Sequence, residues 1–350
     1  MARFQVIMTA PGLAPAARAL LEAAGCAVHL MPPYPDARAI AALAREIGAD
    51  AILCRQGRVD AEVMAAAPKL KIIARHGVGV DEVDVAAAQA RGILVTNAPG
   101  SNARAVAEHT LALILALVKE LKPLGAVIAG GFWRGAAGAV GDVAGKRLGL
   151  VGFGATGREV ARLAGAFGMR VFAQTPGTAP LAGAERVADL PSLLANADIL
   201  SLHCPLRPET RHLIDAAAIA RLPAGAFVIN TARGGLIDEV ALREALDRGH
   251  LAGAALDVFE DEPPPADAAL RDHPRLIATP HVAGVTPLAF ERMGVMAAEC
   301  IVAALTGGIV PEARVVIVPE ARVVIVPEAR VVVRPEARVV TVPPERVVGR

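Results

Sequence analysis

The most constraining feature of the sequence is a glycine-rich turn at residues 152–157, where glycines occupy the first, third and sixth positions. An apolar run at 148–151 precedes the turn, and apolar residues at helical spacing follow it. In such a strand, turn and helix, the first glycine permits a tight turn, the second lets the backbone approach a pyrophosphate, and the third lets the helix pack on the strand. Free N–H groups at the helix N-terminus favour a phosphate. The turn therefore predicts a dinucleotide site at Gly152, Gly154 and Gly157.

Short β-rich runs alternate with alanine-rich helical patterns along most of the chain. In the first part the runs lie at 4–8, 51–53, 71–74 and 93–95. In the second part they lie at 148–151, 170–173, 199–202, 227–230, 253–256 and 276–278. This alternation predicts βαβ units and parallel sheets. A helix at 104–121 is expected to connect the two series, and the last helix, 287–305, to fold back onto the first.

These patterns predict an α/β protein with two doubly wound parallel-sheet domains and a repeat tail. The 350 residues suffice for two domains, each with its own core. We expect a discontinuous, flavodoxin-like substrate domain at 1–99 and 286–308, and a Rossmann-type dinucleotide-binding domain at 100–285. Residues 309–350 form the tail. The cofactor is expected at strand carboxyl ends, in a cleft where both domains hold the substrate.

The tail repeats an octet, Val-Pro-Glu-Ala-Arg-Val-Val-Ile, from Val310. It recurs at 318–325 and 326–333, and less faithfully from Arg334 and Val342. Proline every eight residues interrupts a central strand, whereas the valine runs have strong β character. Two interpretations stay open: a poorly ordered low-complexity extension prone to self-association, or an edge strand or oligomerisation arm.

Charge and cysteine content exclude several classes of protein. Lys and Arg number 36 against 35 Asp and Glu, with no basic stripe, so nucleic acid is not an expected partner. The four cysteines lack metal-ligand spacing and lie in apolar runs, which predicts buried thiols, no metal site and a reducing cytoplasm. The longest apolar stretch, 111–118, is shorter than the roughly 20 residues of a membrane span, and no signal peptide is recognisable. We expect an unexported protein with no membrane partner.

Three polar residues downstream of the glycine turn follow apolar runs and are flanked by Gly or Pro: Arg233, Glu262 and His281. A cation, a carboxylate and an imidazole are the groups that hydride transfer to a 2-keto acid requires of a protein. The sequence therefore predicts an oxidoreductase.

The position that would bind the cofactor's ribose lacks its usual acid. In dinucleotide-binding units an Asp or Glu about 20 residues after the turn takes the ribose hydroxyls. Here the second strand ends at Thr175, which holds that place. Without the carboxylate a 2′-phosphate is not repelled, yet no Arg or Lys occurs before Arg186 to attract one. NAD is the expected cofactor, and NADP stays open.

Many ordered motifs together resemble the D-isomer-specific 2-hydroxyacid dehydrogenases, most closely the branch of phosphoglycerate dehydrogenases and hydroxypyruvate or glyoxylate reductases. The resemblance covers roughly residues 4–308. Its motifs are Gly77-Val78-Gly79-Val80-Asp81, residues 97–102, Ala107-Glu108-His109, residues 152–157, His203-Cys204-Pro205-Leu206, residues 230–235, residues 257–263 and residues 279–284.

The resemblance implies a role for each of the three polar residues. His281 would protonate the keto oxygen and act as base in the reverse direction. Glu262 would pair with His281 and keep the pKa of the imidazole near neutral pH. Arg233 would bind the substrate carboxylate and polarise the carbonyl, since its planar guanidinium can engage two oxygens.

The resemblance also implies the cofactor contacts. Asp257 would hold the nicotinamide carboxamide. Ala155 and Thr156 replace an Arg-Ile pair found in many members, so backbone donors would bind the pyrophosphate. The remaining implied cofactor residues are Gly152, Gly154, Gly157, Thr175, Cys204, Pro205, Thr210, Ala232 and Gly284.

For the substrate, the resemblance assigns its carboxylate to backbone N–H groups of Val78 and Gly79. Arg55 and Arg75 follow strand ends, where they could meet a distal phosphate or simply be solvated.

The helix from Arg104 is expected to help form a homodimer. The alternative function is a nucleotide-sensing, corepressor-like binding protein on the same fold.

Overall fold

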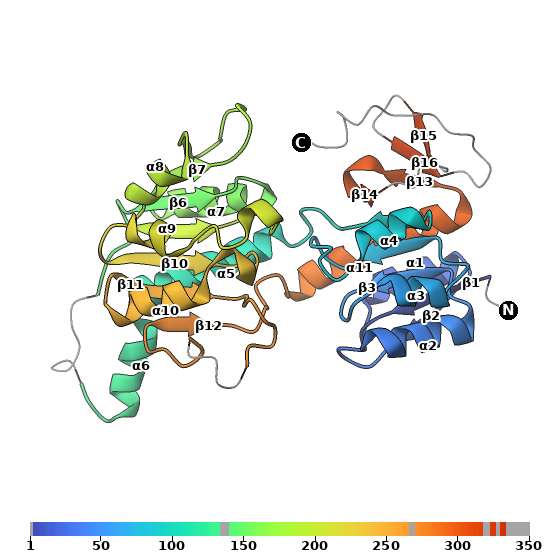
Figure 1. Cartoon of the computed structure of the whole chain (residues 1–350), viewed down its shortest axis with the longest axis horizontal. Helices are drawn as coiled ribbons and strands as arrows, with labels where there is room; N and C mark the ends of the chain where they lie inside the picture. The colour runs from blue at the N-terminus through green and yellow to red at the C-terminus, as the bar shows by residue number, and fades with distance from the viewer. Residues whose placement is uncertain (1–2, 134–139, 266–269, 318–322, 327–329, 334–350) are drawn as a thin grey trace. The chain divides into compact units, whose positions relative to one another are not determined.

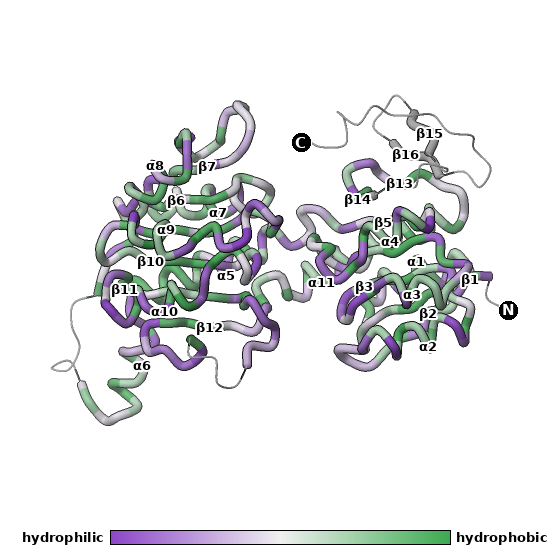
Figure 2. The backbone as a smooth tube through the Cα atoms, in the orientation of Figure 1, coloured by the Kyte–Doolittle hydropathy of each residue, from purple (hydrophilic) through white to green (hydrophobic). Residues whose placement is uncertain are grey.

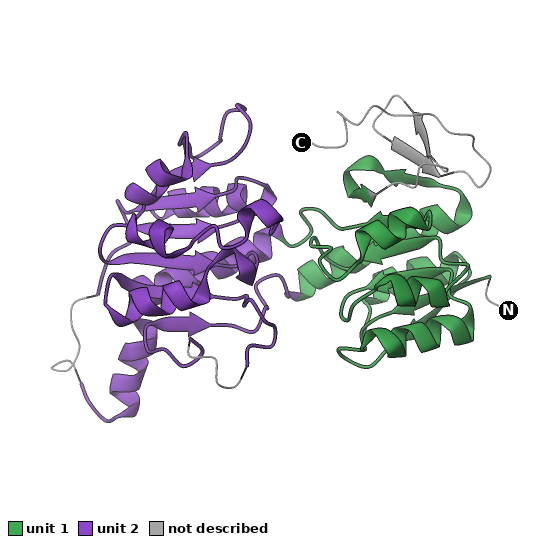
Figure 3. Ribbon diagram, viewed as in Figure 1, with its two compact units in different colours: residues 1–102, 287–350 green, residues 103–286 purple. Residues whose placement is uncertain are grey.

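The computed structural model describes residues 3–133, 140–265, 270–317, 323–326 and 330–333. The chain divides into two compact units (Figure 3). Unit 1 comprises Met1–Asn102 and Pro287–Arg350, and unit 2 comprises Ala103–Thr286. Unit 1 is thus built from two separate stretches of sequence.

Unit 1 is built around a parallel sheet with strand order β2-β1-β3-β4-β5, which is the order of flavodoxin-like folds (Figure 1). The elements of its first stretch are β1 (Phe4–Met8), α1 (Pro15–Ala23), β2 (Cys26–Leu30), α2 (Ala37–Ile47), β3 (Ala51–Cys54), α3 (Ala61–Ala66), β4 (Ile72–Arg75), α4 (Val85–Ala90) and β5 (Leu94–Thr96). Those of its second stretch are α11 (Pro287–Thr306), β13 (Ile309–Pro311), η4 (Glu312–Arg314), β14 (Val315–Ile317), β15 (Val323–Val326) and β16 (Arg330–Val333).

Helices cover both faces of the unit 1 sheet because successive strand residues point to opposite sides. In β4, Ile72 faces a core with residues of α1 and α11, whereas Ile73 faces a core with residues of α2, α3 and α4. Asp side chains cap the N-termini of α2, α3 and α4 by accepting backbone N–H groups, which fixes where these helices begin. The last long helix, α11, packs against α1.

The first octet of the tail extends this sheet. β14 pairs antiparallel with the edge strand β5, and the N–H of Asn97 donates to the carbonyl of Arg314 at 2.9 Å. Val310 is fully buried in the core with α1 and α11. In the backbone, β16 pairs antiparallel with both β13 and β15. For residues 310–317 the edge-strand interpretation fits this arrangement. Residues 318–322, 327–329 and 334–350 lie outside the described residues.

Unit 2 contains a parallel sheet with strand order β8-β7-β6-β9-β10-β11-β12 (Figure 1). Six of these strands follow the order of the Rossmann fold, and β12 adds one more at the edge. The elements are α5 (Ala103–Val118), α6 (Leu121–Ala129), β6 (Arg147–Val151), α7 (Ala155–Ala166), β7 (Arg170–Gln174), β8 (Glu185–Arg186), α8 (Leu190–Ala195), β9 (Ile199–Leu202), η2 (Pro208–Thr210), α9 (Ala216–Ala220), β10 (Ala226–Asn230), η3 (Gly234–Leu236), α10 (Glu239–Asp247), β11 (Leu251–Leu256) and β12 (Leu276–Ala278). The predicted α/β class with two doubly wound sheets is confirmed.

The strands of the unit 2 sheet are largely hydrophobic (Figure 2), and their side chains enter an apolar core on each face. In β10, Val228 packs with residues of α8, α9 and α10, and Ile229 packs with residues of α5 and α7. Each face contributes one core, and the strands supply alternate residues to both. Because both faces of the sheet are apolar, polar site residues are expected beyond the carboxyl ends of the strands.

The expected helix at 104–121 is interrupted. α5 ends at Val118, Glu120 adopts a left-handed backbone (φ 51°), and α6 starts at Leu121. Pro123 explains the break, because in a continuous helix its ring would clash with the carbonyl of Lys119. α6 buries no residue, and large apolar side chains are exposed on it and just after it: Leu121, Ile128, Phe132 and Trp133.

Among the described residues, no helix combines the length and apolar character needed to cross a membrane. The same residues contain no group of His, Cys, Asp or Glu side chains arranged to hold a metal ion.

The burial of Val310 predicts that the first octet stabilises unit 1. We expect a chain ending at Gly308 to have a free energy of unfolding at least about 2 kcal/mol below that of the full chain, the scale for one buried valine. A chain ending at Ile317, which keeps Val310 and β14, is the matched control and should unfold like the full chain. Chemical denaturation of the three chains would contradict this role if both truncated forms were equally stable.

Candidate active site

The glycine turn has the space and the donors that a pyrophosphate needs. It joins β6 to α7 at the point where the strand order of unit 2 reverses. Gly152 has φ 95°, and a Cβ there would lie 2.7 Å from the carbonyl oxygen of His203. A Cβ on Gly157 would lie 2.5 Å from the carbonyl oxygen of Gly152, whereas one on Gly154 would meet open space. Gly154 provides no side-chain cap for α7, so backbone N–H groups of its first turn stay available.

Most of the other predicted cofactor residues follow neighbouring strands at the same edge of the sheet. Ala155 and Thr156 begin α7, and Thr175 follows β7. Cys204 and Pro205 follow β9, and Ala232 follows β10. The hydroxyl of Thr210 is engaged locally, accepting from the N–H of Arg207 at 2.7 Å. Gly284 lies in the turn after His281. Burial lowers the pKa of His203 to about 4, so this imidazole is neutral and suits packing better than acid catalysis.

Arg233, Glu262 and His281 come together in unit 2. Nδ1 of His281 lies 2.6 Å from Oε2 of Glu262, and Oε1 of Glu262 accepts the N–H of Phe259 at 3.1 Å. The charge of Arg233 acts on both His281 and Glu262. Gly234 explains the close approach, because a Cβ there would lie 1.9 Å from the carbonyl carbon of Phe259. Any side chain at 234 would separate the loop of Arg233 from the loop of Glu262.

The pairing changes the protonation of both partners. The hydrogen bond to Glu262 raises the pKa of His281, against opposing effects of burial and of Arg233. Burial disfavours ionisation of Glu262, but the hydrogen bond and charge of His281, with Arg233, outweigh it and lower the pKa of the carboxyl. An imidazolium beside a carboxylate is therefore the favoured state of the pair.

Asp257 fixes the turn that carries His281. Its carboxylate is 1% exposed and accepts the hydroxyl of Thr279 at 2.6 Å and the N–H groups of Val282 and Ala283 at 2.9 and 2.8 Å. An ionised carboxylate offers about four acceptor positions, and these contacts use three of them. This geometry is compatible with the role implied for Asp257, and it adds a structural role that the sequence did not reveal.

Two neighbouring residues of α5 hold the loops of His281 and Arg233. Nε2 of His109 lies 3.1 Å from the hydroxyl of Thr279 and 3.7 Å from Oδ1 of Asp257. Because Thr279 gives its proton to Asp257, Nε2 of His109 must be the donor to Thr279. The hydroxyl of Thr110 bonds that of Thr231, two residues before Arg233, at 3.0 Å. The sequence motif around His109 indicates the family resemblance, but its spacing does not predict this contact.

The predicted substrate residues lie in unit 1, and the two arginines differ. Arg75 donates to the carbonyls of Cys54, Arg55 and Gly79 at 2.9, 2.6 and 2.8 Å and pairs with Glu82 at 2.8 Å. These bonds make Arg75 a structural group. The N–H of Arg55 donates to Thr9 at 2.9 Å, where the strand order reverses between β1 and β3. Its guanidinium lies 4.7 Å from the ring centre of Phe290.

Val78 and Gly79 form a turn held by its carbonyls. Nδ2 of Asn97 donates to the carbonyl of Val78 at 2.7 Å, and Nε of Arg75 donates to that of Gly79. Val78 is exposed and Gly79 half-buried. These two hydrogen bonds fix the backbone of the turn. The N–H groups of the same turn are the ones predicted to bind the substrate carboxylate.

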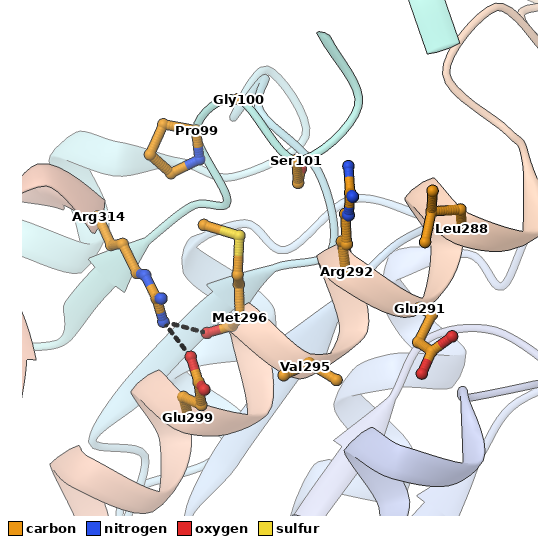
Figure 4. A pocket seen from close by; sticks show the side chains of 10 residues that line it. All are labelled: Pro99, Gly100, Ser101, Leu288, Glu291, Arg292, Val295, Met296, Glu299 and Arg314. Carbon is orange, nitrogen blue, oxygen red and sulfur yellow. Dashed lines mark hydrogen bonds and ion pairs between the residues drawn. The ribbon is translucent and has the colours of Figure 1, made fainter. Parts of the chain in front are cut away.

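A separate open depression of about 580 Å³ lies in unit 1, beside the tail (Figure 4). Arg314 at its rim donates to Glu299 at 2.6 Å and to the carbonyl of Met296 at 3.3 Å. These bonds tie the first octet to α11. None of the predicted site residues is among those lining it: Pro99, Gly100, Ser101, Leu288, Glu291, Arg292, Val295, Met296, Glu299 and Arg314.

Known proteins are similar to this chain in sequence and in fold. A family model described as D-isomer specific 2-hydroxyacid dehydrogenase, NAD binding domain, matches residues 111–283. The D-3-phosphoglycerate dehydrogenase of Mycobacterium leprae is 46% identical over 269 residues, or 76% of this chain and 51% of the relative. The hydroxypyruvate reductase of Thermotoga maritima is 40% identical over 240 residues, or 68% of this chain and 78% of the relative. A crystal structure of a Thermus thermophilus protein has a TM-score of 0.79 at 39% identity and covers 87% of this chain and 97% of its own.

The chain belongs to the D-isomer specific 2-hydroxyacid dehydrogenase family. The predicted family resemblance is thus confirmed. The match to the family's NAD-binding domain falls within unit 2, which holds the glycine turn and the Arg233, Glu262 and His281 cluster. The chain spans about half the length of the Mycobacterium leprae dehydrogenase.

In this family member, Glu262→Gln should lower the pKa of His281. The substitution removes the largest cause of the raised value, so burial and Arg233 then favour the neutral imidazole. A titration of the histidine ring protons by NMR measures the change. Glu260→Gln is the matched control, because Glu260 pairs instead with Arg211 and His212. An unchanged or higher pKa of His281 in Glu262→Gln would contradict the pairing.

Proposed function

We propose that this chain catalyses the NAD-linked interconversion of a D-2-hydroxy acid and its 2-keto acid. The observation that carries the proposal is the contact of 2.6 Å between His281 and Glu262, with the charge of Arg233 acting on both. When bound, the nicotinamide supplies or accepts the hydride. The chain itself then has to bind the acid, orient its carbonyl and move one proton.

His281 is proposed to move that proton. Glu262 occupies Nδ1, so Nε2 is the nitrogen that donates to the keto oxygen during reduction and accepts the proton during oxidation. The raised pKa of His281 favours the protonated form of the imidazole, which is the acid in reduction. Glu262 is thus assigned to hold the ring orientation and stabilise the imidazolium.

Arg233 is proposed to bind the substrate carboxylate and polarise the carbonyl through its guanidinium. The backbone N–H groups of Val78 and Gly79 are assigned to the same carboxylate. The way Asn97 and Arg75 hold the carbonyls of the Val78-Gly79 turn supports the assignment of its N–H groups.

The proposed cofactor is NAD. The residues around it fit such a group, because Gly154 faces open space, the tight turn admits no Cβ at 152 or 157, and α7 offers uncapped N–H groups. Asp257 is assigned to the carboxamide through its remaining acceptor position. The further contacts proposed are Gly152, Gly154, Ala155, Thr156, Gly157, Thr175, Cys204, Pro205, Thr210, Ala232 and Gly284.

Within the substrates of the phosphoglycerate, hydroxypyruvate and glyoxylate type, we propose one with a distal anionic group. Arg55 supports this choice, because it lies where the strand order of unit 1 reverses, the usual place for a ligand in an open α/β sheet. Arg75 contributes less, since its donors already hold backbone carbonyls and Glu82.

The experiment is a steady-state comparison of 3-phosphohydroxypyruvate, hydroxypyruvate and glyoxylate with NADH. We expect the highest kcat/KM with 3-phosphohydroxypyruvate. Arg55→Gln should lower that value about tenfold or more, the scale of a lost charge-assisted hydrogen bond, and leave glyoxylate nearly unchanged. Equal loss on all three acids would overturn the assignment of Arg55, and no turnover of any acid would overturn the proposed function.

His281→Ala tests the acid. We expect turnover to fall by at least about 100-fold, the usual scale for removing a general acid, while NADH affinity stays near that of the unsubstituted chain. His250→Ala is the control, because Nε2 of His250 instead bonds the carbonyl of Ile219 at 3.1 Å. A His281→Ala chain with full turnover would exclude this histidine as the proton donor.

We also propose a homodimer. α5, the helix first assigned to the interface, is largely buried in its own core, and α6 supports the proposal better because its apolar side chains are exposed. Sedimentation equilibrium should give twice the chain mass, and a monomer mass at assay concentrations would contradict it.

We propose a reducing cytoplasm as the location of the protein, because its four cysteines are free.

The corepressor-like alternative has no observation in its favour. The relatives from Mycobacterium leprae and Thermotoga maritima are named as a dehydrogenase and a reductase. The enzyme is therefore the function we retain.

A further inference from the structure

A cation lies at the end of β7, where the sequence had suggested none. β8 pairs parallel with β7, which sets Arg186 opposite Ala173. From there Nη1 of Arg186 donates to the carbonyl of Thr175 at 2.8 Å, and Nη2 donates to the carbonyl of Ala179 at 2.6 Å. Arg186 comes 11 residues after Thr175 in sequence, but sheet pairing brings the two together.

This position has a known meaning in dinucleotide-binding sheets. The residue at the end of the second strand of the fold, here β7, faces the ribose of the adenosine half. An Asp or Glu there binds the 2′-hydroxyl and repels a 2′-phosphate, and a nearby Arg accommodates the phosphate. Thr175 supplies no carboxylate, so the strongest local effect on a ligand here is the charge of Arg186.

Two carbonyls hold the guanidinium of Arg186, and its other N–H donors can bind a ligand. Its two hydrogen bonds within the described residues use two of its five donors, and the residue is exposed. Glu185 precedes it on β8, but alternate strand residues point to opposite faces, and Glu185 lies 3.7 Å from Arg170 at the other end of β7. Asp189 caps α8 by accepting the N–H of Ser192. Both nearby acids are thus engaged with groups other than Arg186.

We propose that Arg186 binds the 2′-phosphate of NADP, so that this chain uses NADP as well as NAD. The inference rests on the proposed cofactor site and deepens it by naming the residue that sets its phosphate preference. The carbonyls of Thr175 and Ala179 hold the guanidinium in place, and the absence of an acid at 175 leaves its charge unopposed by that residue. A planar guanidinium can engage two phosphate oxygens at once.

The test measures binding to the full-length chain without turnover. Adenosine 2′,5′-bisphosphate and adenosine 5′-monophosphate are titrated by calorimetry, since they differ only in the 2′-phosphate. We expect the bisphosphate to bind at least as tightly as the monophosphate. Arg186→Gln should weaken the bisphosphate about tenfold, the scale of a charge-assisted hydrogen bond, and change the monophosphate less than about twofold. Arg186→Lys should recover part of the loss.

Two further variants complete the design. Thr175→Asp should weaken the bisphosphate selectively by restoring the repelling carboxylate. Arg170→Gln is the matched control, because Arg170 is an exposed arginine at the opposite end of β7 and should affect neither nucleotide. Thermal melting of each variant verifies that unit 2 is folded.

Three outcomes would overturn the inference. The first is an unsubstituted chain that binds the monophosphate but not the bisphosphate. The second is an equal loss for both nucleotides in Arg186→Gln, which would mean that the residue only shapes the loop. The third is no loss at all. Normal nucleotide binding without reduction of any 2-keto acid would instead overturn the proposed function alone.

Discussion

The carboxylate of Asp257 is the interaction on which the arrangement of the site depends. A buried carboxylate is costly unless hydrogen bonds satisfy it, and Asp257 obtains them from the turn that carries His281. His281 itself has a left-handed backbone (φ 53°), which costs a non-glycine residue about 1 kcal/mol or more. The turn stays in this form because its N–H groups satisfy Asp257, and the N–H of His281 donates to the carbonyl of Asp257 at 2.8 Å.

The same constraint reaches α5 and the loop of Arg233. Nε2 of His109 donates to the hydroxyl of Thr279, and that hydroxyl donates to Asp257. The hydroxyl of Thr110 forms a hydrogen bond with that of Thr231, in the loop before Arg233. One helix therefore sets the separation of two loops that are far apart in sequence. Gly234 then allows the loop of Arg233 to rest against Phe259, close to Glu262. Orientation of three side chains thus follows from one buried charge, one helix and one missing Cβ.

The fold could be read from the sequence because its signals are local. The glycine turn and most of the alternation of strands and helices follow from spacing within short windows, although β2 and the two-residue β8 were not predicted. Both sheets have the strand orders that such alternation implies. Arg233, Glu262 and His281 were recognisable by residue type and flanking Gly or Pro. What the sequence did not reveal depends on strand neighbours. Arg75 donates to carbonyls at the end of the adjacent strand β3. Arg186 reaches Thr175 only because β8 pairs with β7.

The place of the first octet in the fold also depends on tertiary contacts. A repeated sequence has identical local preferences, so only tertiary contacts can distinguish one copy from another. Val310 reaches the core directly after α11, and Arg314 meets Glu299 on that helix. Val315 and Val316 then pack against opposite faces of the sheet, as successive strand residues do. The edge of β5, which would otherwise offer unpaired backbone groups, is covered by β14. The contacts with α11 therefore place the first octet against the edge of β5.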